Sequence, residues 1–185
     1  MKQYSFSSTT VQRIPELLAG WKGVTLLTLI TAACSQIAFR LPFTPVPVSM
    51  QVFAVLLSGL LLGSKRGAAA QVQYLLLGAL GAPVFALWHG GFIWLTGPTG
   101  GYLLAFPAAA ALAGIAAGRS TRSQTTAAVA GLLLIYLCGC TQLALLLHLS
   151  IPAAFVQGAG LFLLWDTLKT VMAVAISVRL LPRNG

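Results

Sequence analysis

Two ionisable side chains, Asp166 and Lys169, stand three positions apart in an apolar stretch near the end of the chain. Residues at positions i and i+3 share one face of a helix, so a helical stretch would bring the two groups together. One interpretation is a mutual ion pair that lets an apolar helix carry both charges. The other is a ligand site, in which the carboxylate accepts N–H hydrogen bonds and the ammonium donates to a carbonyl or carboxylate.

The composition indicates which class of protein holds these groups. Of 185 residues, 58% are hydrophobic and 7% are charged, and the mean hydropathy is +0.91, which excludes a water-soluble globular domain. The net charge of +9 would suit a nucleic-acid binder only if the basic residues formed a stripe. Because they fall in ones and twos between apolar stretches, we predict a membrane protein with no nucleic-acid partner.

Six apolar stretches of roughly membrane-spanning length follow one another along the chain. They predict an all-α membrane protein with six transmembrane helices. We divide it into a cytoplasmic or interfacial N-terminal segment at 1–23, a transmembrane substrate-binding domain at 24–181 and a cytoplasmic tail at 182–185. The predicted spans lie near residues 24–41, 48–63, 68–87, 102–118, 126–149 and 160–181.

The basic residues predict the orientation of these spans. Nine of the eleven precede the first span, lie at or beyond the end of the last, or lie in the second–third and fourth–fifth connections. The positive-inside rule therefore predicts that both termini and these connections are cytoplasmic. Arg40 is then the one basic residue of an outer loop, and Lys169 lies inside a span. The nine are Lys2, Arg13, Lys22, Lys65, Arg66, Arg119, Arg122, Arg179 and Arg183.

This orientation gives each polar residue a depth in the membrane. At 1.5 Å per helical residue, Asp166 lies about 20 Å and Lys169 about 15 Å from Arg179 at the cytoplasmic end. An ionisable residue at mid-membrane costs about 2.5–3.5 kcal/mol on insertion scales and normally faces the protein interior or a wet cavity. Gln51 and Arg40 lie toward the outer side. We therefore predict an outward-facing polar cavity.

Two outer loops lie beside the predicted cavity. The glycine-rich loop at 87–101 contains Trp88 and His89, which on their own are typical of residues at the membrane interface. The start of the following span, at 97–102, is dense in turn residues and favours a lid or floor for a ligand, because irregular backbone at membrane depth is tolerated beside a cavity. The proline-rich loop at 41–49 is either a stiff turn or a gate.

Small residues at spacing four in the first span would let another helix approach closely, either within the bundle or from a partner subunit. They are Thr28 with Ala32 and Thr31 with Ser35. Other activities have no support in the sequence. It contains no G-x-x-x-x-G-K-[ST] phosphate loop, so the chain is predicted not to hydrolyse ATP, and no metal-binding cluster. An intramembrane enzyme using Asp166 and Lys169 would lack a second carboxylate and an activated nucleophile.

Four segments in this order strongly resemble the BioY family, the biotin-binding S component of energy-coupling factor (ECF) transporters, and the resemblance resumes at Asp166–Lys169. It implies a six-helix S-component fold, capture of biotin from outside, and import driven by a transmembrane T subunit with two cytoplasmic ATPases. The localisation implied is the bacterial cytoplasmic membrane, and no cofactor is implied, since biotin is the ligand. The segments are Pro45–Gln51, Gly59–Gly67, Gly78–Phe85 and Gly97–Leu104.

The resemblance also implies which residues form the ligand site: Thr99, Gly100, Gly101, Tyr102, Asp166 and Lys169. The chemistry of biotin then suggests roles. Asp166 suits a ureido N–H, Lys169 the ureido oxygen or the carboxylate, and Trp88 or Tyr102 the ring faces. Arg40 or His89 would meet a carboxylate at the mouth. An S component for another vitamin remains an alternative, and the sequence leaves open whether the chain forms a homo-oligomer.

Overall fold

Six helices occupy the six apolar stretches in the computed structural model, which describes residues 17–181. The predicted all-α class is confirmed, although most helices are shorter than the stretches that predicted them. The first ends at Gln36, where a short strand begins, and the third ends at Ala79, just before Gly81 at φ +101° and Pro83. The helices are α2 (Gly20–Gln36), α3 (Gln51–Leu62), α4 (Ser64–Ala79), α6 (Gly100–Gly114), α7 (Thr121–Leu147) and α9 (Leu163–Leu180).

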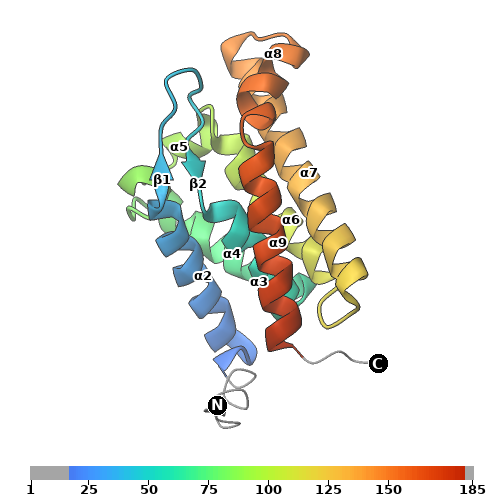
Figure 1. Ribbon diagram of the computed structural model, residues 1–185. Coiled ribbons are helices and arrows are strands. Elements are labelled where there is room, and N and C mark those ends of the chain that lie inside the picture. Colours follow the sequence, from blue (N-terminus) through green and yellow to red (C-terminus); the bar gives the residue numbers. More distant parts are fainter. Residues whose placement is uncertain (1–16, 182–185) are drawn as a thin grey trace, which may run out of the picture.

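The shorter elements gather at one end of the helices (Figure 1). Two strands pair antiparallel, with Ala38 opposite Ser49 and Phe39 opposite Val48. The loop between them contacts the π-helix that precedes α9, since the hydroxyl of Thr44 donates to the Gln157 carbonyl at 2.9 Å. The short elements are β1 (Ala38–Phe39), β2 (Val48–Ser49), η1 (Ala86–Trp88), α5 (Ile93–Thr96), α8 (Ile151–Phe155) and the π-helix η2 (Val156–Gly160).

Helix α6 packs along α7 and against α3 and α4, while α9 contacts α3 and α7 and α2 contacts α3 and α4. The α3–α4 turn relies on Gly63 at φ +79°, a conformation that costs glycine little. Gly59 is also required, because a Cβ on it would collide with the Ala110 carbonyl of α6. The glycines of this segment therefore bring three helices close together at the end opposite the strands.

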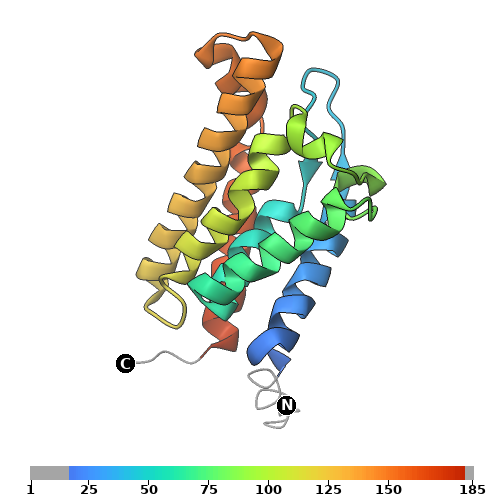
Figure 2. The same cartoon turned by 180° about the vertical axis from the view of Figure 1, so that it is seen from behind.

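The start of α2, the α3–α4 and α6–α7 turns and the end of α9 share that opposite end (Figures 1 and 2). These positions hold the basic residues Lys22, Lys65, Arg66, Arg119, Arg122 and Arg179. Arg40 follows β1 at the other end. The predicted grouping of basic residues is therefore present in the described part of the chain, while Lys2, Arg13 and Arg183 lie outside the described residues.

The outer surface of the bundle is apolar. Large side chains point outward all round it, among them Leu164 of α9, which is 80% exposed, and Leu137 of α7, which is 66% exposed. Among residues 17–181, one helix, Thr121–Leu147, is long and apolar enough to cross a membrane by itself. The pair Ile151–Gly160 and Leu163–Leu180, bent by 48°, is a second candidate, and α3 and α6 are shorter apolar helices.

Candidate functional site

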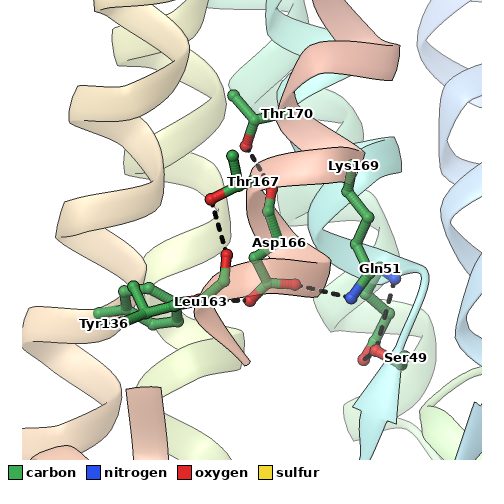
Figure 3. A network of polar contacts seen from close by, with 8 residues as sticks. All are labelled: Ser49, Gln51, Tyr136, Leu163, Asp166, Thr167, Lys169 and Thr170. Atoms are coloured by element: carbon green, nitrogen blue, oxygen red, sulfur yellow. Dashed lines mark hydrogen bonds and ion pairs between the residues drawn. The ribbon is translucent and has the colours of Figure 1, made fainter. Parts of the chain in front are cut away.

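Asp166 lies in the first turn of α9 and both of its carboxylate oxygens accept hydrogen bonds. The Lys169 ammonium donates to Oδ1 at 2.6 Å, and the Tyr136 hydroxyl of α7 donates to Oδ2 at 2.7 Å. Figure 3 shows the two α9 side chains turned toward each other, with Tyr136 on the opposite side of the carboxylate. All three are buried, at 4–6% exposure. The ion pair foreseen at spacing three is therefore formed, and a third residue supports it.

The segment before α9 determines where this pair lies. The π-helix η2 precedes α9 and the chain bends by 48° between them. π-Helical turns are uncommon and frequently occur at functional sites. The Gly158 carbonyl of η2 accepts the Tyr102 hydroxyl at 2.9 Å, and the Tyr102 ring lies against Gly139 of α7, where a Cβ would overlap it. Tyr102 is thus held between two elements.

A cavity extends from the buried pair to the surface at the end of the molecule that carries the strands. Asp166 and Lys169 line its inner part, and Arg40, which is exposed, lines it as well. Its walls are largely apolar and aromatic, with a few polar groups among them, which is typical of small-molecule sites. The walls include Pro45, Val46, Val48, Val52, Phe85, Trp94, Leu103, Phe106, Ile135 and Phe162.

The cavity brings together seven of the ten ligand residues that the sequence suggested: Arg40, Gln51, His89, Thr99, Tyr102, Asp166 and Lys169. Trp88, Gly100 and Gly101 do not line it. Trp88 is 71% exposed. A Cβ on Gly101 would meet the Cys138 carbonyl of α7, and one on Gly100 would meet the Leu95 carbonyl. In the structure these two glycines allow close packing of backbone rather than contact with the cavity.

The Gln51 side chain is held in the cavity wall by two partners. Its amide nitrogen donates to the Tyr74 hydroxyl at 2.6 Å, and its amide oxygen accepts from the Ser49 hydroxyl at 2.8 Å. The Tyr74 hydroxyl donates in turn to the Val84 carbonyl at 2.9 Å. This chain of bonds connects α3, α4 and the segment before η1. A side chain fixed in this way presents its polar groups to the cavity in one orientation.

At the mouth of the cavity, Arg40 lies beside His89. The Arg40 Nη2 and His89 Nε2 atoms are 3.4 Å apart, and His89 Nδ1 lies 2.7 Å from the Ala86 carbonyl. The Trp94 ring covers the imidazole, with ring centroids 3.8 Å apart. These contacts bring β1, η1 and α5 together around one basic side chain.

Sequence reasoning missed Tyr136 and the aromatic walls. A tyrosine hydroxyl in the middle of an apolar helix needs a hydrogen-bond partner when it is buried. The position of Tyr136 in the sequence could therefore have indicated a buried polar contact. Nothing in the sequence, however, indicated that its partner would be Asp166. Phe85, Phe106 and Phe162 gave no signal, because aromatic residues in apolar helices face lipid as readily as a cavity.

The small residues of the first span contact this chain's own helices. Thr28 donates to the Ala70 carbonyl and Thr31 accepts from Gln71, both of α4, and Ser35 donates to the Val84 carbonyl. The three are at most 1% exposed, while Ala32 is half-buried. The partner interface suggested for these residues is therefore corrected for the three hydroxyls, since packing within the bundle already encloses them.

Known proteins that are similar to this chain include several biotin transporters. The family model described as BioY family matches residues 10–184. The probable biotin transporter BioY of Pyrococcus horikoshii is 42% identical, covering 85% of this chain and 93% of that protein. The biotin transporter BioY of Thermotoga maritima is also 42% identical, over 76% and 83%. The probable biotin transporter BioY of Bacillus subtilis is 32% identical, over 83% and 87%.

A solved structure has the same fold. It is the S-component for biotin from an ECF-type ABC transporter, with a TM-score of 0.81 over 95% of this chain and 94% of that one, at 20% identity. The described helices therefore adopt the S-component fold. The family match extends over nearly the whole chain, and the curated relatives align over most of their own lengths. This chain belongs to the BioY family.

Proposed function

We propose that this chain is the membrane-embedded S component of an ECF transporter and that it captures biotin from the outer side of a bacterial cytoplasmic membrane. The observation that carries the proposal is the cavity ending at Asp166, in a chain whose family relatives are named biotin transporters. The cavity joins a buried carboxylate and ammonium to apolar walls, and biotin has a polar ureido ring and a terminal carboxylate joined by an apolar chain.

The geometry supports specific contacts for the ureido ring. Each Asp166 oxygen accepts one bond inside the protein and keeps lone pairs for the ureido N–H groups. Lys169 has three donors, of which one is directed at Asp166, so it can also donate to the ureido oxygen. Buried donors and acceptors left without partners cost about 1–3 kcal/mol each, so this site rejects ligands that lack the ureido edge.

The proposed topology is six membrane-crossing helices with both termini in the cytoplasm. It is supported by the exposed apolar side chains around the bundle and by the basic residues grouped at the end opposite the cavity mouth. Helix α3 has 12 residues, about 18 Å at the helical rise, so it crosses the hydrocarbon core only together with the strand and turn beside it.

Import requires energy that this chain does not supply, because its sequence has no phosphate-binding loop. We therefore propose that a T subunit and cytoplasmic ATPases drive biotin import. We also propose that the chain can associate with further copies of itself. Co-purification from the native membrane tests the coupling. A chain that still imports biotin after the T subunit and ATPases have been deleted would contradict obligatory dependence on them.

Thermal unfolding of the detergent-solubilised protein tests the ligand. A compound that binds only the folded state raises the unfolding midpoint according to its excess over the dissociation constant. Biotin and desthiobiotin, which share the ureido ring, are expected to raise the midpoint, whereas thiamine and riboflavin are not. If another vitamin stabilises the protein and biotin does not, the ligand assignment is wrong although the fold is unchanged.

A further inference from the structure

A glutamine side chain lies partly exposed at the surface of the bundle, at the depth of the hydrocarbon core. Gln73 is nine residues beyond Ser64, where α4 starts at the basic end of the bundle, which is about 14 Å at the helical rise. The hydrocarbon core is about 30 Å thick, so Gln73 lies near its middle. The side chain is half-buried between α2 and α4, and it does not line the ligand cavity.

The contacts of Gln73 leave part of its carboxamide without a partner. Within residues 17–181 the group has one hydrogen-bond contact, between its Oε1 and the Thr28 hydroxyl of α2 at 3.0 Å. That hydroxyl has a single proton, and it also lies 2.9 Å from the Ala70 carbonyl and 3.0 Å from the Val24 carbonyl. With either end of the amide turned toward Thr28, at least one N–H donor and one acceptor lone pair stay free in the described part of the chain.

Other polar side chains that face outward from the bundle are bonded within their own helices. The hydroxyls of Thr141 on α7 and Thr167 on α9 are exposed, and each donates to a carbonyl one turn earlier at 2.6 Å. Lipid chains offer neither donors nor acceptors, so an N–H group left without a partner in hydrocarbon is costly. The free part of the Gln73 carboxamide therefore indicates a polar partner from outside this chain.

A second copy of this chain supplies such a partner. A carboxamide both donates and accepts, so two copies related by a two-fold axis near Gln73 can exchange a pair of hydrogen bonds between identical groups. The same two helices carry large exposed apolar side chains within four positions of Gln73 or Thr28. They are Leu26 and Leu29 of α2 and Val72, Leu76 and Leu77 of α4, each 37–59% exposed.

We propose that Gln73 is the polar contact of an interface between two copies of this chain, formed by the α2–α4 side of the bundle within the membrane. The inference rests on the proposed function for its membrane topology, and it identifies the face by which the copies associate. Lys22, Lys65 and Arg66 lie at the basic ends of α2 and α4, and like charges on two copies oppose close approach there. The copies are therefore expected to meet near mid-membrane, where Gln73 lies.

The test measures self-association of the full chain, labelled at its C-terminus and reconstituted in liposomes at decreasing protein-to-lipid ratios. Energy transfer between donor-labelled and acceptor-labelled copies gives the dissociation constant of the dimer. Gln73→Leu removes the donor and the acceptor and keeps a side chain of similar size. It is expected to raise this dissociation constant about tenfold, because two interhelical hydrogen bonds are lost.

Two variants make the result specific to the carboxamide. Gln73→Asn keeps the amide on a shorter stem and should retain part of the association. Thr141→Val is the matched control, because it removes an outward-facing hydroxyl that is already bonded within its own helix. It should leave the dissociation constant of the dimer unchanged.

Cross-linking tests the same face while the carboxamide is kept. The native cysteines, Cys34, Cys138 and Cys140, are first replaced by alanine, and biotin binding checks that the fold is intact. Leu76→Cys then places a thiol one turn from Gln73, and Leu137→Cys places one on α7, at leucines that are 57% and 66% exposed. A bifunctional thiol reagent added to the liposomes is expected to join copies through position 76 and not through position 137.

The outcomes separate this inference from the proposed function. If biotin does not bind the wild type in the same liposomes, biotin capture is wrong, whereas the interface is judged by energy transfer and cross-linking alone. If the wild type stays monomeric, or if Gln73→Leu leaves the dissociation constant unchanged, the proposed interface is wrong. Loss of a co-purifying T subunit in Gln73→Leu, with the association of copies unchanged, would mean that a helix of the T subunit occupies this face instead.

Discussion

Among the buried polar clusters of the described residues, two differ in charge and in the space beside them. The carboxylate cluster is Asp166, Lys169 and Tyr136, which join α7 to α9 and line the cavity. The amide cluster is Thr31, Ser58 and Gln71, which join α2, α3 and α4 and do not line it. Members of both clusters are at most 6% exposed. Burial alone therefore does not identify a binding site.

The amide cluster has the properties of a structural contact. The Gln71 amide nitrogen donates to the Thr31 hydroxyl at 3.1 Å and to the Ser58 hydroxyl at 3.0 Å. Each hydroxyl also donates to a carbonyl of its own helix, Leu27 for Thr31 and Val55 for Ser58. Neutral hydrogen bonds of this kind join helices in membranes for about 0.6 kcal/mol each, with no ligand required.

Burial of the carboxylate cluster costs more free energy than burial of the amide cluster. A charged pair loses its solvation, and the mutual attraction of the two charges only partly offsets that loss. Hydrophobic residues of similar size would hold α7 and α9 together at least as well. The presence of a charged pair beside a cavity is therefore better explained by a ligand than by packing. The comparison predicts that changes in one cluster alter ligand binding and changes in the other alter stability alone.

The largest effect is expected from Asp166→Asn. The amide nitrogen would face one of the two donors, Tyr136 or Lys169, and Lys169 would lose its counter-charge. Biotin affinity should fall at least about 100-fold by titration. The free energy of unfolding should fall by about 3 kcal/mol, because an unpaired buried charge remains.

The double variant Asp166→Asn with Lys169→Met separates the two effects. Removal of the buried ammonium should restore much of the stability, since it eliminates the uncompensated charge. Binding should stay lost. A double variant that binds biotin as tightly as the wild type would mean that the pair serves only to hold helices together.

A smaller and different effect is expected from Gln71→Ala. The side chain is fully buried, so its removal deletes two interhelical bonds and leaves a void, at a cost of about 2 kcal/mol in the free energy of unfolding. Biotin affinity should not change. Denaturant unfolding and titration of the same preparation measure both. A weaker affinity for biotin would show that the amide cluster is energetically coupled to the cavity.

Tyr136→Phe removes one hydroxyl from the carboxylate cluster and leaves the ring in place. Asp166 Oδ2 would lose its donor at 2.7 Å, so the orientation of the carboxylate is less well defined. Biotin affinity should fall about tenfold, close to the lower end of what one hydrogen bond to a charged group contributes. Tyr102→Phe is the matched control, because its hydroxyl donates to a carbonyl instead, and should cost less.

The same comparison explains what the sequence could predict. Asp166 and Lys169 stood out because charged residues are rare in apolar stretches, and their spacing alone brings them together. Tyr136 could not be assigned, because its contact with Asp166 depends on how α7 is rotated against α9, which is a property of the tertiary packing. The six helices followed from hydropathy, but their ends did not, since short strands and turns replace the outer parts of α2 and α3.

Glycines carried a weaker signal than the charges. Their density at 97–102 favoured a lid or floor for a ligand, whereas Gly100 and Gly101 allow close approach of the protein's own backbone. In the structure the Leu95 carbonyl lies close to Gly100, and α7 lies close to Gly101. Gln142 of α7 completes this contact by donating to the Gly97 carbonyl at 2.8 Å. Glycine-rich loops therefore predict proximity without identifying the neighbour.

The smallest effect is expected at Trp88, next to a residue that lines the cavity. Trp88 and His89 are adjacent in the chain, yet the tryptophan side chain is 71% exposed and the imidazole lies under Trp94 at the mouth. Trp88→Ala should therefore change biotin affinity by less than about twofold, because an exposed ring that contacts no ligand contributes little to binding. Its backbone N–H, which donates to Gln36 at 2.9 Å, is kept in the variant. A tenfold loss of affinity by titration would mean that the indole covers bound ligand, and the edge of the site would have to be extended to include it.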